Sequence, residues 1–319
     1  MNERPRIAVV GSANMDLVTM TPRMPRIGET LEARDFFTGY GGKGANQAIA
    51  AARLGAEVVM VARIGDDMFG AEMRRNFEEN GVDASHVKVV EGCPTGVAAI
   101  SVDDDGNNCI MIVKGANGRL LPADVENAAR SLRGCGMMLL QLEIPVETVY
   151  AAIRLAVGEG VPVLLNPAPG MRLEAEYLRM VDFLAPNETE LEIITGMPAA
   201  GPDDALAAAR RLVEGGVRRV IVTLGEKGSL YVDERGHLLA DPLPVNPVDT
   251  TGAGDAFIGG FAFYYLRTGD VGEAMRMANR YAAISTMKRG TQSSFAPMDE
   301  FMRTLGGLEA SASAKKCSE

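Results

Sequence analysis

The chain has 319 residues, 47% of them hydrophobic, and a formal net charge of -10 from 32 Lys and Arg against 42 Asp and Glu. This acidic balance argues against nucleic acid or an anionic membrane surface as a partner and favours a small molecule. The length suits one large α/β unit, so we expect a single domain over residues 1–305 and a flexible tail over residues 306–319, which are rich in Ser, Ala and Lys.

Short apolar runs along the chain predict the buried strands of a sheet. They cover residues 7–10, 58–61, 137–140, 161–165, 183–185 and 220–223. Helix-like segments lie between many of them, at residues 123–132, 147–158 and 203–214. This alternation predicts an α/β fold with a mostly parallel central sheet, helices on both faces, and ligands at the carboxyl ends of the strands.

Two stretches interrupt this alternation and predict antiparallel strands. The first is residues 30–37, and the second is a hairpin of residues 96–102 and 108–113 joined by an acidic turn. A calcium loop is the alternative for the turn, but an EF-hand register would put Ser101 at its first position and Ile112 at its twelfth. A hairpin turn is therefore the interpretation.

The cysteines and histidines give no sign of a zinc site or of histidine-based catalysis, because the cysteines lack C-x-x-C spacing and the histidines are only two. They are Cys93, Cys109, Cys135, Cys317, His86 and His237. We interpret the cysteines as reduced, as in the cytoplasm. The first apolar run is too short for a signal peptide, and no stretch reaches about 18 apolar residues.

A first glycine-rich motif, GYGGKGANQ, covers residues 39–47 and precedes an expected helix over residues 48–54. A dinucleotide site would need an acidic residue after the next strand, where Ala62 and Arg63 stand instead, so only a phosphorylated nicotinamide cofactor stays open. Lys43 and Asn46 are three residues apart at a helix start, which points both toward one ligand and suits a polyhydroxylated one. A solvated lysine and a capping asparagine are the alternative.

A second motif, DTTGAGDAF over residues 249–257, predicts a phosphate cradle with its own base. Gly252 and Gly254 allow a tight turn that aims backbone N–H groups and a helix dipole at an anion. The same dipole should keep Asp255 ionised, ready to accept the proton of a hydroxyl that attacks phosphorus. An ordinary glycine turn with a capping aspartate is the alternative.

Taken with GSANMD, LQLEIP, LNPAP, PNETE and VTLGEKG in this order, the two motifs make nearly the whole chain similar to the ribokinase-type sugar kinase family. The resemblance implies a small β lid from about residues 14–40 and 96–114, often a homodimer contact. It implies transfer of the γ-phosphoryl group of ATP to the primary hydroxyl of D-ribose. The alternatives are 2-deoxyribose, another neutral sugar or a nucleoside as substrate and, in a different class, a non-catalytic sugar- or nucleotide-binding regulator.

The family's sugar-binding positions carry over to residues that also have ordinary structural explanations. Asn14 and Asp16 could cap a turn, and Glu143 could be a plain carboxylate at a strand end. The resemblance implies that the sugar contacts Asn14, Asp16, Gly42, Lys43, Asn46, Glu143 and Asp255. Asp255 is the implied base, and the amides of Gly252, Ala253 and Gly254 form the implied anion hole.

The implied ATP contacts are Asn187, Thr223, Gly225, Gly228, Gly254 and Asn279. Asn279 stands where the family often has histidine, which leaves the adenine contacts open. Glu190 is the implied Mg²⁺ group, through water, although Asn187 and Glu190 also match a capping box. The resemblance further implies a potassium site, mostly of backbone oxygens, at Asp249, Thr251, Ser285, Lys288, Gly290 and Ser294.

Overall fold

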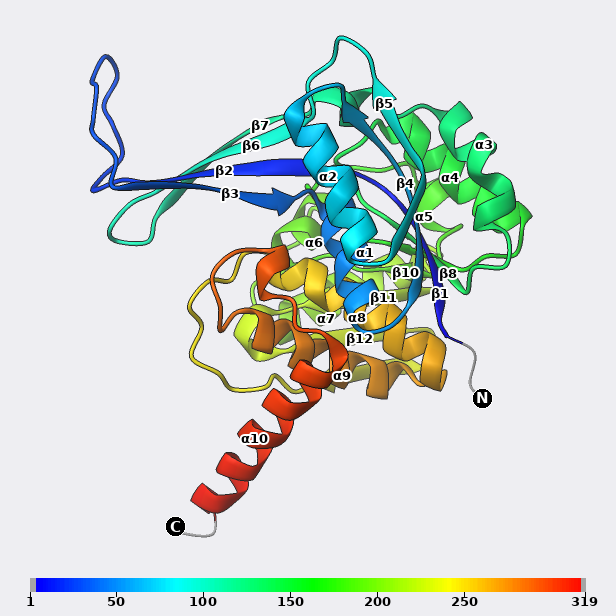
Figure 1. Cartoon of the computed structure of the whole chain (residues 1–319). Coiled ribbons are helices and arrows are strands. Elements are labelled where there is room, and N and C mark those ends of the chain that lie inside the picture. The colour runs from blue at the N-terminus through cyan, green and yellow to red at the C-terminus, as the bar shows by residue number, and fades with distance from the viewer. Residues whose placement is uncertain (1–3, 317–319) are drawn as a thin grey trace.

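The computed structural model describes residues 4–316, and the side chains of residues 4–310. Its main feature is a nine-stranded sheet (Figure 1). The strands are β1 (Arg6–Val10), β4 (Glu57–Gly65), β5 (Val82–Val90), β8 (Met137–Leu140), β9 (Val163–Leu165), β10 (Phe183–Leu184), β11 (Arg219–Thr223), β12 (Ser229–Asp233) and β13 (Gly236–Ala240). Their order is β13-β12-β11-β10-β9-β8-β1-β4-β5, parallel from β11 to β5 with an antiparallel hairpin at one edge. The predicted mostly parallel sheet is confirmed.

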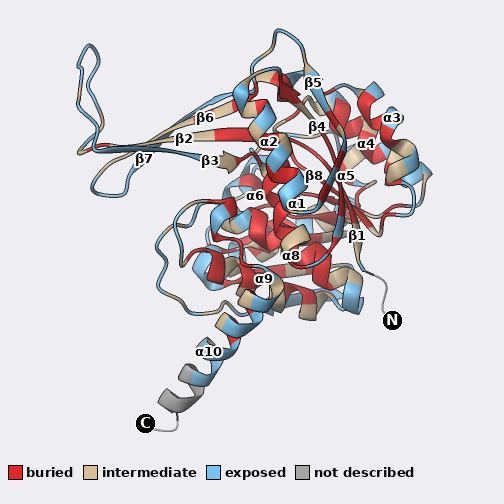
Figure 2. Ribbon diagram, in the orientation of Figure 1, coloured by how far each residue is buried: buried red, intermediate tan, exposed pale blue. Residues whose placement is uncertain are grey.

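Helices cover both faces of this sheet because alternate strand residues point to opposite sides. In β1, Ile7 and Val9 belong to one buried cluster, whereas Ala8 and Val10 belong to the other. On the first face lie α1 (Lys43–Arg53), α2 (Met68–Glu79), α8 (Ala253–Thr268), α9 (Val271–Ser285) and part of α10 (Met298–Lys316); on the second lie α3 (Pro122–Leu132), α4 (Val146–Gly158), α5 (Ala175–Leu178), α6 (Glu188–Thr195) and α7 (Pro202–Glu214). Figure 2 shows the buried strands between these layers. The prediction of helices on both faces is also confirmed.

The bounds of most predicted elements lie within two residues of the observed bounds. The larger differences occur where the local sequence pattern does not match the pairing of the strands or the turn into a helix. The apolar run at residues 161–165 predicted a strand from Val161, but β9 begins at Val163. The helix expected over residues 48–54 begins earlier, at Lys43, directly after Gly42, whose φ of 86° marks the break between strand and helix. The first glycine-rich motif therefore spans the end of a strand and the start of a helix, with Gly42 between them.

A second, four-stranded sheet extends from the main body (Figure 1). Its strands are β2 (Asn14–Met20), β3 (Asp35–Gly41), β6 (Gly96–Val102) and β7 (Asn108–Val113), in the order β3-β2-β6-β7. The predicted hairpin of β6 and β7 is confirmed, and β2 pairs antiparallel with β3 but parallel with β6. The sequence did not identify β2, because polar residues interrupt its apolar pattern.

The strand expected over residues 30–37 is wrong at its start, since β3 runs from Asp35 to Gly41. Its partner β2 ends at Met20, which pairs with Asp35, so earlier residues have no strand beside them. The glycines at positions 39 and 41 therefore lie in a strand, and only Gly42 forms the turn into α1.

At the other end of the chain, α10 runs to Lys316, into the range where the sequence predicted a flexible tail from residue 306. Leu, Glu, Ala and Lys in this stretch are strong helix formers, so local propensity continues the helix. Residues 317–319 lie outside the described part of the chain. Among the helices that the structure describes, none is long and apolar enough to cross a membrane.

Candidate active site

The polar residues named from the two glycine motifs meet where α1 and α8 begin, at the carboxyl ends of the parallel strands. Gly252, with φ of 80°, precedes α8, and a Cβ there would lie 2.4 Å from Thr291 Cγ2. Gly254 has open space around an added Cβ, so its surface faces a cavity. The Ala253 N–H donates to Thr250 O at 3.2 Å, so this member of the expected anion hole is engaged within the turn.

Asp255 lies in the first turn of α8 and is only 6% exposed. Asn46 Nδ2 donates to its Oδ2 at 2.8 Å, and Gln47 Nε2 donates to its Oδ1 at 3.0 Å. Burial raises the pKa of Asp255, whereas Lys43 and the two amides oppose that rise. The sequence predicted that the helix dipole would keep this carboxylate ionised, whereas burial acts in the other direction and favours its protonated form.

Further carboxyl groups surround Lys43. Glu143 Oε2 accepts a hydrogen bond from the backbone N–H of Lys43 at 2.9 Å and another from Ser12 Oγ. Burial, and then the charges of Glu143 and Asp255, raise the pKa of Asp16 to about 7. The charge of Asp255 raises the pKa of Lys43, against the effect of burial. Several carboxylates therefore crowd around one ammonium group. We call this part of the site, with Asp16, Lys43, Glu143 and Asp255, the corner.

Glycines at positions 41 and 42 leave room for the two predicted sugar residues of β2. A Cβ at Gly41 would lie 2.2 Å from Asp16 Oδ1, and one at Gly42 would lie 2.7 Å from the Asn14 N atom. Asn117 Nδ2 donates to Asn14 Oδ1 at 2.6 Å, which fixes that amide in a buried position. The structure thus brings Asn14, Asp16 and Gly42 to the same side of the corner as Lys43.

A small cavity of about 100 Å³ opens beside these groups. Lys43, Glu190, Asp255 and Gly254 line it, together with Asn166, which the sequence analysis did not assign. Asn187, Thr223 and Gly254 also line a larger cavity of about 840 Å³, so the two spaces adjoin. A linear ligand can therefore reach from the larger cavity to Asp255.

The capping box expected at the start of α6 is confirmed. Asn187 Oδ1 accepts from the Glu190 N–H at 2.8 Å, and Glu190 Oε2 accepts from the Asn187 N–H at 2.9 Å. Both residues still line the small cavity, and burial raises the pKa of Glu190. The structural and the functional interpretations of this pair are therefore compatible.

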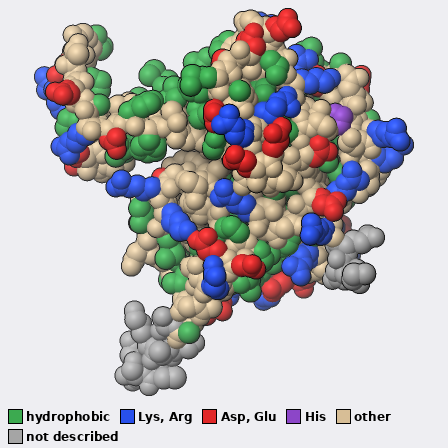
Figure 3. Space-filling model, viewed as in Figure 1, with side chains coloured by type: hydrophobic (Ala, Val, Ile, Leu, Met, Phe, Trp, Pro, Cys, Tyr) green, Lys and Arg blue, Asp and Glu red, His purple; other side chains and the backbone are tan. Residues whose placement is uncertain are grey.

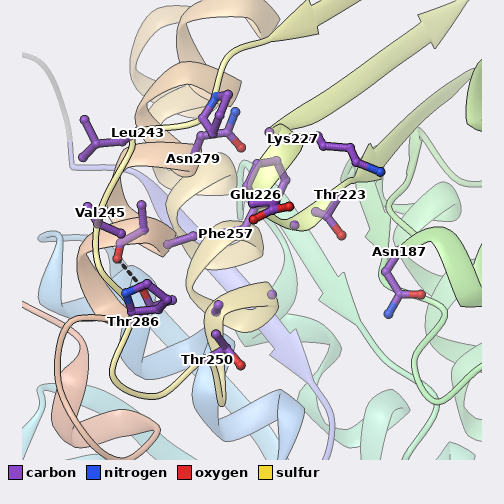
Figure 4. Close-up of a pocket in the computed structure, with 18 of the residues that line it drawn as sticks. Asn187, Thr223, Glu226, Lys227, Leu243, Val245, Thr250, Phe257, Asn279 and Thr286 are labelled. Carbon is purple, nitrogen blue, oxygen red and sulfur yellow. Dashed lines mark hydrogen bonds between the residues drawn. The ribbon is translucent and has the colours of Figure 1, made fainter. Parts of the chain in front are cut away.

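Figure 4 shows the larger cavity, with Thr223 and Asn187 on one side of it and Asn279 on the other. Gly225 and Gly228 line it as well, and a Cβ at Gly228 would lie 2.2 Å from Ala240 O. Asn279 Nδ2 donates to the carbonyl oxygens of Ala240 and Asp241, so its amide holds the loop that forms one wall. All the residues predicted to contact ATP thus line one cavity.

The predicted cation residues come together only in part. Asp249 Oδ1 accepts from the Thr251 N–H and Oδ2 from the Gly290 N–H, each at 2.9 Å. Burial opposes the charge of Asp249, but these hydrogen bonds outweigh it and lower its pKa. The Ser285 and Ser294 hydroxyls donate to Ala282 O and Thr291 O. The Lys288 ammonium pairs with Glu300. Lys288 therefore has only its backbone oxygen to offer an ion, and the two serine hydroxyls use their protons within the chain.

Sequence reasoning missed several buried polar residues at the corner. Gln47 bonds Asp255 directly, Ser12 bonds Glu143, and Asn166 accepts from Gln47 Nε2 at 3.2 Å. Gln47 directly follows Asn46, and Asn166 lies in the LNPAP motif, so a polar residue inside an apolar motif was the available signal. Among the described residues, no group of three His, Cys, Asp or Glu side chains is placed to hold a metal by itself.

Comparison with known proteins agrees with this geometry. The family model for pfkB family carbohydrate kinases matches residues 4–298, so the chain belongs to the pfkB family of carbohydrate kinases. It is 49% identical over 300 residues to a deoxyribokinase of Salmonella typhimurium (94% of this chain, 98% of the relative). It is 39% identical over 303 residues to a ribokinase of Haemophilus influenzae (95% and 99%).

Solved structures show the same relationship. A Thermotoga maritima ribokinase superposes with a TM-score of 0.86 at 34% identity, over 94% of this chain and 99% of that one. An Arabidopsis thaliana ribokinase complexed with ribose and ATP gives a TM-score of 0.86 at 33% identity, over 94% and 98%. The chain is thus a sugar kinase of the ribokinase type.

Proposed function

We propose that this kinase transfers the γ-phosphoryl group of ATP to the primary hydroxyl of a neutral pentose, with D-ribose, giving ribose 5-phosphate, as the first candidate. One observation carries the proposal: a buried, hydrogen-bonded Asp255 opens onto a small cavity that adjoins a cavity large enough for a nucleotide. 2-Deoxyribose is the second candidate, favoured by the 49% identity to the Salmonella deoxyribokinase.

The charge of the corner supports a neutral substrate. Lys43 is the only basic residue among the described residues that line the small cavity, and Asp255 and Glu190 line it too. A sugar phosphate would bring a dianion beside these carboxylates and would need further Arg or Lys side chains to bind it. Hydroxyl groups, in contrast, can donate to carboxylates and accept from Lys43 and Asn46.

In the proposed reaction, Asp255 accepts the proton of the attacking hydroxyl while that oxygen forms a bond to the γ-phosphorus and the bond from phosphorus to the ADP oxygen breaks. Gly254, at the N-terminus of α8, lets the phosphate approach the positive end of the helix dipole. Closure of the small sheet over the sugar would exclude water, which would otherwise accept the phosphoryl group.

Glu190 suits the predicted Mg²⁺ position, because its carboxylate is buried and lines the small cavity beside Gly254. Mg²⁺ prefers oxygen ligands and keeps several waters, so one carboxylate acting through water is sufficient when ATP supplies the remaining oxygens. The ion would neutralise negative charge on the phosphate oxygens.

We also propose a potassium site at Asp249 and the neighbouring carbonyl oxygens of Thr251, Ser285, Lys288, Gly290 and Ser294. The support is that Asp249 joins the segment before α8 to Gly290, so an ion there would order the turn that carries Gly252. Potassium should raise kcat above its value in sodium or choline, and Asp249→Ala should remove both the dependence and most activity. Equal rates in all three salts would refute the site.

We propose that the protein forms a homodimer through the small sheet. The support for this proposal is the exposed apolar strand β7. In β7, Ile110, Met111, Ile112 and Val113 are all exposed, and Figure 3 shows hydrophobic side chains over this sheet. Apolar area of this kind marks interaction sites. Sedimentation of the wild type and of Met111→Glu checks it, and a wild-type monomer would contradict it. We also propose a cytoplasmic location, which the free thiols of Cys93, Cys109 and Cys135 support; Cys317 lies outside the described residues.

The experiment that tests the function measures ADP release with D-ribose, 2-deoxyribose, other neutral sugars and nucleosides, with the product identified by mass and phosphorus NMR. Asp255→Asn is the matched control, since it keeps the size of the side chain. Release with ribose or deoxyribose selects between the two candidates. Ligand binding without ADP release would favour the non-catalytic regulator instead.

A further inference from the structure

A row of buried side-chain amides, joined by hydrogen bonds, leads to Asp255 through Asn46 of α1. Gln292 Nε2 donates to Asn46 Oδ1 at 2.9 Å, and Asn46 Nδ2 donates to Asp255 Oδ2 at 2.8 Å. Gln292 Oε1 in turn accepts from Asn76 Nδ2 at 2.8 Å. Asn46, Asn76 and Gln292 are between 2% and 5% exposed, so water does not compete for these groups.

The row has a direction, because every amide accepts from the residue behind it and donates to the one ahead. It starts at Arg53, whose Nε donates to Asn80 Oδ1 at 2.8 Å, and Asn80 Nδ2 donates to Asn76 Oδ1 at 3.2 Å. A guanidinium group can only donate, and an ionised carboxylate can only accept. A cation at one end and Asp255 at the other therefore fix the orientation of all the amides between them, and such chains polarise cooperatively.

We propose that Arg53, Asn76 and Gln292 are positioning residues for phosphoryl transfer, which hold the amide of Asn46 with its N–H group on Asp255. The inference rests on the proposed role of Asp255 as the base. If Gln292 no longer donates, Asn46 Oδ1 loses its partner and the amide is free to turn away from the carboxylate. Asp255 then keeps only the hydrogen bond from Gln47.

The segment that carries Gln292 is itself held by Arg53. Arg53 Nη1 donates to the carbonyl oxygens of Gln292 and Phe295, so one guanidinium group fixes both the start of the row and the backbone of 3-10 helix η3 (Gln292–Ser294). The same segment includes Gly290, which donates to Asp249. The amide row and the short chain segment from Gly290 to Gln292 thus connect the loop around Asp249 with the base.

A loss of the Asn46 hydrogen bond should change the acid side of the pH profile. The charged groups that face Asp255 are Lys43 from α1, Asp16 from β2, Glu143 after β8 and Glu190 from α6. Gln292 contacts none of these, so its replacement leaves their charges in place. The hydrogen bond favours the ionised carboxylate, and without it the pKa of Asp255 rises, so the acid limb moves to higher pH.

The test compares Gln292→Met, which keeps the length of the side chain but neither donates nor accepts through an amide, with Tyr281→Phe. Tyr281 is buried beside Arg53, and its hydroxyl donates to Ala296 O at 3.0 Å, so Tyr281→Phe is a matched structural change that removes none of the hydrogen bonds of the row. For Gln292→Met we expect kcat to fall by about three- to tenfold and the acid limb of kcat to rise by about half to one pH unit, with KM for ATP unchanged. Tyr281→Phe should move neither kcat nor the limb.

Asn76→Leu, one amide further from Asp255, should shift the limb in the same direction by less. An unchanged pH profile in Gln292→Met, or an equal shift in Tyr281→Phe, would overturn the proposal. If the wild type phosphorylates no sugar, the proposed function fails, and the positioning role is decided in the substrate-free protein. There, carbon-13 NMR titration of the Asp255 carboxyl, assigned with Asp255→Asn, should show a higher pKa in Gln292→Met; an equal pKa would also overturn the role.

Discussion

The corner around Asp255 and the larger cavity share Asn187, Thr223 and Gly254, yet they are built differently. At the corner, about 100 Å³ is bounded by charged side chains that buried hydrogen bonds hold in place. The larger cavity, about 840 Å³, is walled by the loop from Pro242 to Pro247 and by one side each of α8 and α9. Proton transfer depends on the position of individual donor and acceptor atoms, whereas nucleotide binding depends on the shape and surface area of the cavity.

Asp255→Asn should separate the two regions most strongly. Asparagine keeps the size of the side chain but cannot accept the proton, so kcat should fall by about 10² or more while both ligands bind within a few-fold of wild type. Steady-state kinetics and calorimetric titration with sugar and with an ATP analogue measure the two effects. Near-normal turnover would remove Asp255 from the role of base.

Asp16→Ala tests whether the sugar end is independent of the cavity. Loss of a charge-assisted hydrogen bond to a hydroxyl should weaken sugar binding by about 1.5–3 kcal/mol, while ATP affinity stays unchanged. Asp83→Ala, which removes an exposed carboxylate on β5, is the matched control. Equal losses for both ligands would show that Asp16 supports the fold and not the sugar.

Two glycines of one motif should respond in opposite ways. Gly254→Ala meets no protein atom within 4 Å, so stability should hold, but the methyl group enters the shared space and kcat/KM for ATP should fall by about tenfold. Gly252→Ala has a positive φ and a contact of 2.4 Å with Thr291, so it should cost about 1–3 kcal/mol of unfolding free energy. Thermal and urea unfolding, read beside kinetics, check the pair. A destabilised Gly254→Ala with normal kcat/KM would contradict this division.

The smallest expected effect is a pH dependence of KM for the sugar that KM for ATP does not share. The pKa of Asp16 is raised to about 7, so its carboxylate protonates as the pH falls through that value and becomes a poorer acceptor. KM for the sugar should therefore rise, by at most about tenfold, between pH 8 and pH 6, while KM for ATP stays flat. Asp16→Asn, which does not titrate, should abolish the slope. A slope that persists in this variant would assign it to another group.

Much of this protein follows from its sequence alone. Short runs of apolar residues, such as residues 137–140, are removed from water when the chain folds. The strands and the parallel sheet could therefore be predicted from the local sequence pattern. The glycine motifs placed Lys43, Asn46 and Asp255 at helix starts, because backbone turns of this kind need residues without a Cβ.

Only the tertiary structure decided which side chains meet. Gln292 is 246 residues from Asn46, and Gln47 is 208 residues from Asp255, so no local pattern could pair them. The start of β3 likewise depends on where β2 ends, and the pKa of Asp255 is raised chiefly by burial. Hydrogen bonds, strand pairing and desolvation act between atoms that are close in space, and the packing of α1 against α8 brings these atoms together.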